Sequence, residues 1–418
     1  MVFYLPMSQR SALATVFLAV LIDLMGFGIV LPLLPFYASR FSAPPIVIGL
    51  LYSIYSFAQL IFSPIWGGIS DRVGRRPIML MSTLGASFAY ALFGLARTLP
   101  LLFLSRLIAG IMGGNISTAQ AYVADVTSPE ERAKGMGLLG AAFGVGFVLG
   151  PAIASLLIHP AFLKFFRIPP ESKFALPGFF ASFLSFTSFL LVFFKLPETV
   201  KPKEKDPQRI AKLGIFTKSF WRSIAEQESS GMKHLLPLLM GCIFLYSFAQ
   251  SSLYSAFPLF CEARLKLSAE KVGMLYAYLG IIAVFVQGGL IRVLVKKFGE
   301  EKLFFLGSIL MTAGFALLPA GRSLGLLIIF LSFLSLGGSF MGPTLNSLIS
   351  KQADPTEVGR AMGTSQGIAA LGRVFGPAWG GLLYGLGPTL PFFGTAVGLV
   401  YTIFVGNRLK RDKKSTSH

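Results

Sequence analysis

The chain has 418 residues, a net charge of +19 and only 13% charged residues, about half the charged fraction of a soluble globular protein. This deficit excludes an ordinary soluble multidomain protein and favours many membrane spans. The two cysteines form no pair motif, and no nucleophile–base, metal-ligand or ATP-binding pattern occurs. The sequence therefore predicts no metal, no cofactor and no enzyme.

Twelve apolar stretches are long enough to cross a bilayer. Only helices suit such lengths, because a backbone in lipid must satisfy its own hydrogen bonds. The first stretch is too long for a signal peptide and is predicted to be the first span. The stretches run at 11–37, 46–69, 77–97, 99–124, 133–159, 174–196, 235–260, 270–295, 302–320, 323–350, 358–385 and 388–407.

The basic residues are distributed unevenly between the loops. If both termini are cytoplasmic, cytoplasmic segments hold 26 of the 37 Lys and Arg residues, the opposite loops hold 9, and the spans hold Arg106 and Arg373. This bias predicts cytoplasmic termini in a multi-pass protein, with a bacterial inner membrane as the expected location. It explains the basic charge without a nucleic-acid partner.

A charged, proline-containing segment at 198–233 separates an N-terminal bundle (11–197) from a C-terminal bundle (234–408), which a basic tail (409–418) follows. The segment is predicted to be a cytoplasmic linker. Its later part alternates apolar and basic residues. This pattern fits either an amphipathic helix on the inner leaflet or a solvated connector, and both remain open.

The chain repeats itself across this linker. An acidic and a basic residue recur in both halves and are predicted to form cytoplasmic charge pairs. A duplicated six-span unit explains the recurrence. The sequence thus predicts an all-α membrane protein with twelve transmembrane helices in two pseudo-symmetric six-helix bundles. The matching residues are Asp125 with Asp354, Arg132 with Arg360, and Gly150 with Gly376.

The densest local motif is G-x-x-x-D-R-x-G-R-R, between the second and third spans. Its glycines permit close helix approach and a tight turn. Its acid is predicted to lie at the positive N-terminal end of a neighbouring helix, and its arginines to pair with this acid or with lipid headgroups. The motif consists of Gly67, Asp71, Arg72, Gly74, Arg75 and Arg76.

This loop resembles the signature of the major facilitator superfamily. Further motifs are similar to those of drug:proton antiporters, and especially of tetracycline-efflux proteins. They are the opening helix around Asp23, the Arg106-x-x-x-Gly110 motif of the fourth span, and glycine–proline arrays in spans 5 and 11. These arrays comprise Gly146, Gly150 and Pro151, and Gly372, Gly376 and Pro377. The resemblance implies that both helices lie between the halves, where the arrays would permit a hinge or rocking contact; ordinary tight packing is the alternative.

The chain also departs from the tetracycline exporters. It has Ala89 in the third span and Met311 in the ninth, where the exporters carry acids, and Ala283 in the eighth, where they carry a histidine. Tetracycline itself is therefore not predicted as the substrate.

Asp23 is the only acid near the middle of a span. A charge at that depth costs roughly 2.5–3.5 kcal/mol on insertion scales, and such residues are usually functional. Paired with Arg106 of span 4 the carboxyl should stay ionised, and separated it should take a proton. The pair is predicted to couple transport to protons; a static buried ion pair is the alternative.

Arg373 is the second interior cation, and it is predicted either to bind an anionic substrate group or to pair between helices. Four further polar residues lie where the family resemblance implies a substrate cavity. Each is either a ligand contact or an interhelical hydrogen bond. They are Gln59, Asn115, Gln250 and Asn346.

The predicted function is secondary active transport, as proton-coupled efflux of a small amphipathic compound by alternating access. The alternatives are a metabolite or nutrient carrier and, in another class, a transporter-like receptor or scaffold that no longer cycles. The expected partners are a small-molecule substrate, protons and membrane lipid, and the expected state is a monomer.

Overall fold

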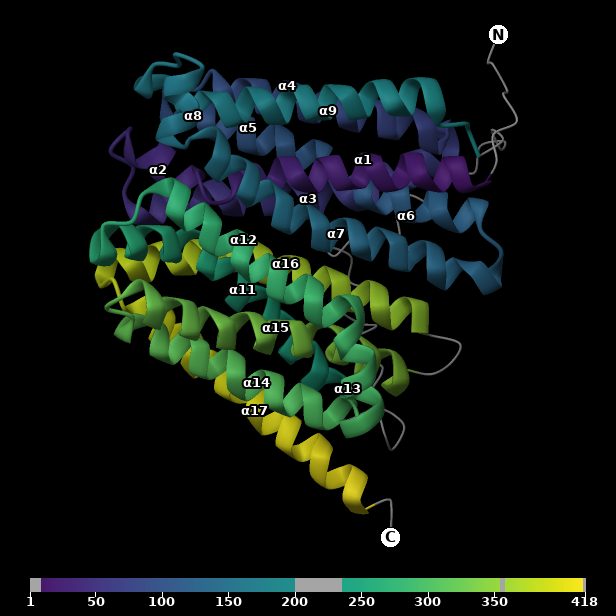
Figure 1. Ribbon diagram of the computed structural model, residues 1–418. Helices are drawn as coiled ribbons and strands as arrows, with labels where there is room; N and C mark the ends of the chain where they lie inside the picture. Colours follow the sequence, from purple (N-terminus) through teal and green to yellow (C-terminus); the bar gives the residue numbers. More distant parts are fainter. Residues whose placement is uncertain (1–8, 200–234, 354–357, 416–418) are drawn as a thin grey trace. The chain divides into compact units, whose positions relative to one another are not determined.

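The computed structural model describes residues 9–199, 235–353 and 358–415, and the regular elements of these ranges are all helical (Figure 1). The first half contains α1 (Gln9–Val30), α2 (Leu34–Ser39), α3 (Pro45–Val73), α4 (Arg75–Gly94), α5 (Leu99–Met112), α6 (Asn115–Val126), α7 (Pro129–Leu157), α8 (Pro160–Phe165), η1 (Pro170–Ser172) and α9 (Ala175–Lys195). The second half contains α11 (Leu235–Leu265), α12 (Ala269–Phe285), η4 (Val286–Leu290), α13 (Ile291–Phe298), α14 (Glu300–Leu317), η5 (Leu318–Ala320), α15 (Leu324–Gln352), α16 (Val358–Leu386) and α17 (Leu390–Ser415).

Within the described ranges, eleven helical segments are long and apolar enough to cross a membrane. Helix α16, with 29 residues, falls at the predicted eleventh span and completes the expected twelve. Two of the segments are interrupted in their interior. The fourth span breaks at Gly113 and Gly114 between α5 and α6, and the eighth contains the single π-helical turn η4 between α12 and α13. Such breaks are frequent at functional positions.

The described residues form two compact units. The first contains the residues up to Ala43, those from Ile54 to Thr199, and the short segment Ser268–Ala277; the second contains Pro44–Ser53, the residues from Leu235 to Leu267, and those from Tyr278 onward. Two helices are exceptions to a division by sequence halves: the first turns of α3 belong to the second unit and the first turns of α12 to the first.

Glycines explain both exceptions. A Cβ on Gly49 of α3 would overlap the carbonyl oxygen of Pro377 in α16, and the Ser53 hydroxyl donates to the Val374 carbonyl at 2.6 Å. In the first unit, a Cβ on Gly273 of α12 would overlap the Ser155 hydroxyl of α7. The start of each helix thus packs closely on a helix from the other half of the sequence.

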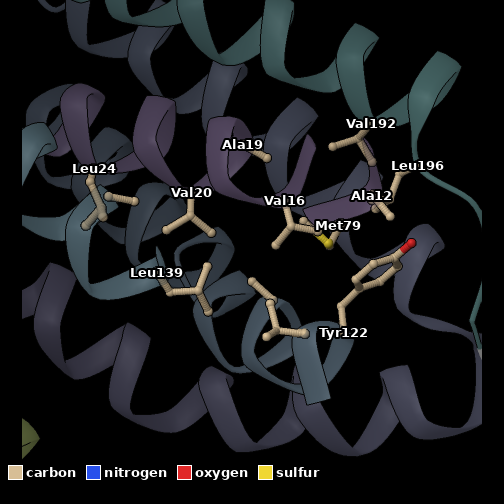
Figure 2. Close-up of a cluster of buried hydrophobic side chains, with 13 residues drawn as sticks. Ala12, Val16, Ala19, Val20, Leu24, Met79, Tyr122, Leu139, Val192 and Leu196 are labelled. Atoms are coloured by element: carbon tan, nitrogen blue, oxygen red, sulfur yellow. The ribbon is translucent and has the colours of Figure 1, made fainter. Parts of the chain in front are cut away.

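The core of the first unit centres on α1, which packs against α7 and α9. Figure 2 shows the cluster of buried side chains at this junction, where Val16, Val20 and Leu24 of α1 meet Leu139 of α7 and Val192 of α9. Leu24 is the neighbour of Asp23, so the acid stands on a backbone that the core holds in place.

The glycine arrays of spans 5 and 11 pack inside the units. A Cβ on Gly150 would lie 2.7 Å from Gly28 of α1, and one on Gly146 would lie 2.7 Å from the Leu24 side chain. In the second unit, Gly372 and Gly376 meet the backbone of α11 in the same way. The array glycines therefore join α7 to α1 and α16 to α11 within each unit, while the array prolines lie against helices from the other half of the sequence: the Pro377 carbonyl against Gly49, and the Pro151 carbonyl 3.2 Å from a Cβ on Gly273. The small size of the glycines lets these backbones approach closely.

Candidate functional site

The first unit brings Asp23, Tyr90 and Arg106 together from α1, α4 and α5. Both charged groups, and Tyr55 of α3, act electrostatically on the Tyr90 hydroxyl. Gly26, almost one turn after Asp23, makes room for Tyr90, because a Cβ there would overlap the tyrosine ring and hydroxyl. The predicted association of Asp23 with Arg106 thus has a tyrosine as its common neighbour.

Aromatic rings surround Arg106. Its side chain is buried (2% exposed), and its guanidinium carbon lies 4.9 Å from the ring centroid of Phe93 and 5.7 Å from that of Tyr90. Both rings belong to α4 and lie three residues apart, on one helix face. A cation that faces two π systems is stabilised in a place where water is excluded.

Gln59 forms a hydrogen bond at the break in the fourth span. Its side-chain amide donates to the Gly113 carbonyl at 2.9 Å, where α5 ends and the helical bonding pattern stops. This contact is the interhelical hydrogen bond that was the alternative to a ligand role. Asn115 begins α6, and its side chain lies outside the described residues.

The second unit brings polar aromatic residues together around Arg373. Arg373 of α16 and Tyr246 act electrostatically on Tyr254 of α11. The Gln250 amide lies 3.5 Å from the Tyr246 hydroxyl, which in turn donates to the Gly338 carbonyl of α15 at 3.3 Å. The Tyr52 ring, from the start of α3, lies 6.0 Å from the Tyr254 ring.

Asn346 of α15 lies two turns beyond Gly338, on the same side of that helix. Its Oδ1 atom is buried and accepts no hydrogen bond from the described residues. A buried acceptor without a hydrogen-bond donor destabilises the folded state unless a ligand or water binds it.

The loop motif between spans 2 and 3 is mostly helical. Helix α3 continues through Asp71 to Val73, and the chain turns at Gly74, whose φ of 109° favours glycine. Arg75 pairs with Asp71 at 2.5 Å and with Asp125 of α6 at 3.0 Å, and it also donates to the Ser70 hydroxyl at 2.6 Å. One buried arginine therefore joins α3, α4 and α6.

The carboxylate at the N-terminus of α4 comes from Glu198, which follows the sixth span. Its two oxygens accept from the backbone N–H groups of Arg75 and Arg76 at 2.9 and 3.2 Å. Asp71 does not take this place at α4: it is largely exposed and pairs with Arg75 four residues on, and its predicted place at the N-terminus of a neighbouring helix stays a prediction. The first turn of α4 contains two arginines and no acid, so a carboxylate from elsewhere offsets the helix dipole.

The remaining residues of the motif make separate contacts. Arg76 donates to the Phe193 carbonyl of α9 at 2.6 Å, and Gly67 faces the Ser117 hydroxyl of α6 at ordinary contact distance. Arg72 lies in the last turn of α3.

The predicted cytoplasmic charge pairs differ in the structure. Asp125 pairs with Arg75, whereas Arg132 donates to the Ala124 carbonyl at 3.3 Å. The reason is that α6 ends beside the start of α4, while Arg132 already belongs to the first turn of α7. Asp354 and the side chain of Arg360 lie outside the described residues.

The second unit has an ion pair equivalent to Arg75–Asp125, with the positions of acid and base exchanged. Gly299, with a φ of 82°, turns the chain into α14, and Glu300 then bonds Lys351 and the Ser347 hydroxyl of α15, each at 2.8 Å. Arg75 and Asp125 are 50 residues apart, and Glu300 and Lys351 are 51 apart. The two ion pairs thus occupy equivalent places with the acid and the base exchanged.

Three residues of these contacts belong to no motif of the sequence: Tyr90 and Phe93 of α4, and Glu198 after the sixth span. Tyr90 and Phe93 carry no motif, although their spacing places both on one helix face with the buried Arg106. Glu198 is the first residue of the predicted linker. Two sequence features indicate its contact with α4. Glu198 is an acid close to the end of the sixth span, and α4, after the short loop between spans 2 and 3, begins with two arginines and no acid.

Known proteins are similar to this chain over most or nearly all of its length. Tetracycline resistance protein, class D, of Salmonella ordonez is 32% identical and covers 85% of each chain. Multidrug resistance protein 1 of Bacillus subtilis (strain 168) is 28% identical over 99% of each. The crystal structure of the human organic anion transporter MFSD10 (TETRAN) matches with a TM-score of 0.67 and 26% identity over 96% of this chain and 100% of that one.

The family model described as Major Facilitator Superfamily matches residues 16–377 and again residues 239–417. The second match begins near the start of α11, as a duplicated half requires. Together with the solved transporter structures, it confirms the predicted twelve-helix fold and a carrier without enzymatic chemistry. This chain belongs to the Major Facilitator Superfamily.

Proposed function

We propose that the protein is a secondary active transporter that exports a small amphipathic compound in exchange for protons, and that Asp23 carries the coupling proton. The observation that carries this proposal is the grouping of Asp23 with Tyr90 and Arg106 inside the first unit. The names of the relatives, tetracycline and multidrug resistance proteins, support efflux as the direction.

The coupling follows from charge. With Asp23 ionised, Arg106 has a counter-charge inside the bilayer; with Asp23 protonated, the guanidinium keeps only polar and π contacts. The two protonation states therefore favour different surroundings for Arg106. A conformational change that alters these surroundings shifts the affinity of Asp23 for its proton, which is the bias that coupling requires.

The membrane placement belongs to the same proposal. Both termini and the linker at 198–233 lie in the cytoplasm of a bacterial cell, and the chain works as a monomer. The excess of Lys and Arg in the corresponding loops supports this orientation.

Flux measurements on Asp23→Asn in proteoliposomes with an imposed pH gradient test the coupling. The amide keeps shape and hydrogen bonding but cannot titrate, so gradient-driven transport should be lost while substrate exchange and binding persist. Glu171→Gln, in the exposed element η1, is the matched control and should transport normally.

Two other outcomes have clear meanings. Loss of folded protein in Asp23→Asn, by roughly 3–5 kcal/mol as for a broken buried pair, would support a static ion pair. Normal pH-driven flux in this variant would contradict the proposal and indicate a uniporter or a sodium-coupled carrier.

A further inference from the structure

The interior of the second unit carries a positive charge among tyrosines. Arg373 stands near the middle of α16 and acts on Tyr254 of α11. In the sequence from residue 235 onward, the acids stand at or beyond the ends of the spans: Glu262, Glu270, Glu300, Glu301, Asp354, Glu357 and Asp412. At the depth of Arg373, this half therefore has a net positive charge, whereas the first unit combines a cation with an acid.

The backbone around Arg373 is fixed by packing. Gly372 lies against α11, where a Cβ would be 2.7 Å from the Phe244 carbonyl oxygen, and the Val374 carbonyl accepts the Ser53 hydroxyl at 2.6 Å. The side chain of Arg373 is nevertheless only half-buried, as are those of Gln250 and Tyr254. A fixed backbone with a partly accessible cation is suited to hold a ligand group in one orientation.

The neighbours of Arg373 combine two kinds of recognition. Tyr246 and Gln250 form a short chain of polar contacts that ends on α15. Tyr52 and Tyr254 present two rings inclined at 43° to one another. Hydroxyl and amide groups suit the polar end of a ligand, and aromatic faces suit a planar apolar body.

We propose that this Arg373 cluster (Tyr52, Tyr246, Gln250, Tyr254 and Arg373) binds the negatively charged group of an aromatic organic anion, which is the transported substrate. The inference rests on the proposed transport function and narrows its substrate class. A guanidinium binds a carboxylate through two parallel charge-assisted hydrogen bonds, which a neutral or cationic compound cannot form.

Equilibrium binding of two radiolabelled compounds with the same body, 2-naphthoate and 2-naphthamide, tests this on the purified full-length protein at pH 7. The wild type should bind the carboxylate more tightly than the amide. Arg373→Gln should weaken carboxylate binding about ten- to hundred-fold, the usual effect of a lost charge-assisted contact, and leave amide binding unchanged. Arg292→Gln, an exposed arginine on α13, is the matched control and should bind as the wild type does.

Equal affinity of the wild type for the two compounds would overturn the proposal. So would a loss of both affinities in Arg373→Gln, which indicates a packing role, or no loss of either. If Arg373→Gln does not fold, Arg373→Lys decides: its carboxylate affinity should fall several-fold with amide binding unchanged, and an unchanged carboxylate affinity overturns the proposal. Because binding needs no gradient, this test is independent of Asp23→Asn: normal flux in that variant removes proton coupling and leaves the anion site standing.

Discussion

Tyr90 illustrates how a residue without a motif acquires a role from its neighbours. It directly follows Ala89, the position at which the tetracycline exporters carry an acid, and it is itself almost fully buried. Asp23 acts electrostatically on its hydroxyl, and its ring centroid lies 5.7 Å from the guanidinium carbon of Arg106. The aromatic ring stabilises the guanidinium most when Asp23 is protonated, because Arg106 then lacks its counter-charge.

Two substitutions at this position separate the ring from the hydroxyl. Tyr90→Phe keeps the π face beside Arg106, and Tyr90→Leu removes it. A desolvated cation–π contact contributes about 0.5–2 kcal/mol, and one pH unit corresponds to about 1.4 kcal/mol. Proton-driven flux in Tyr90→Leu should therefore reach its half-maximum about one pH unit lower than in Tyr90→Phe. Identical pH profiles at equal protein levels would show that the ring has no part in coupling.

At the scale of elements, α4 and α14 both place a negative charge at their positive N-terminal ends, but the charge comes from different parts of the chain. Helix α14 begins with Glu300 and Glu301, whose negative charges interact favourably with the positive N-terminal end of the helix dipole. Helix α4 begins with Arg75 and Arg76, whose positive charges are unfavourable there. Its first backbone N–H groups donate to the Glu198 carboxylate instead. Glu198 thereby connects the end of the sixth span to the turn between the second and third spans.

Replacing Glu198 by Gln should destabilise this junction. The amide retains a weaker acceptor but loses the charge, so the free energy of unfolding should fall by about 0.5–2 kcal/mol. Denaturant unfolding in detergent measures it, with Glu171→Gln as the control, since that side chain caps no described long helix. An unaltered unfolding midpoint in Glu198→Gln would mean that the capping contact contributes nothing to stability.

At the scale of the whole molecule, the duplication has kept positions and changed charges. Gly74 and Gly299 turn the chain at equivalent places, and the ion pairs beside them have opposite polarity. Likewise, Asp23 with Arg106 occupies the first unit, and Arg373 with tyrosines the second. The repeated backbone thus supports two different interiors, one with an acid and a base and the other with a cation among tyrosines.

The orientation of the molecule is testable by cysteine labelling. Residue 205 falls in the predicted linker and lies outside the described residues. The positive-inside bias predicts that it faces the cytoplasm. In Lys205→Cys, with Cys242 and Cys261 replaced by Ala, a membrane-impermeant maleimide should label the protein only after the membrane is opened. Labelling of intact cells would reverse the assigned topology.

The sequence by itself determined the twelve spans, the duplication and the identity of the interior charges, because length, apolar composition and the rarity of intramembrane ions are local properties of a chain in lipid. Only the tertiary structure decided which groups meet. The partner of Asp125 is Arg75 and not Arg132, the acid that caps α4 is Glu198 and not Asp71, and Tyr90 interacts with both Asp23 and Arg106. These contacts join residues that are 16 to 123 positions apart, and no helical period encodes them: they follow from close helix packing at glycines such as Gly26 and Gly74, whose missing side chains leave the space that Tyr90 and Glu198 occupy.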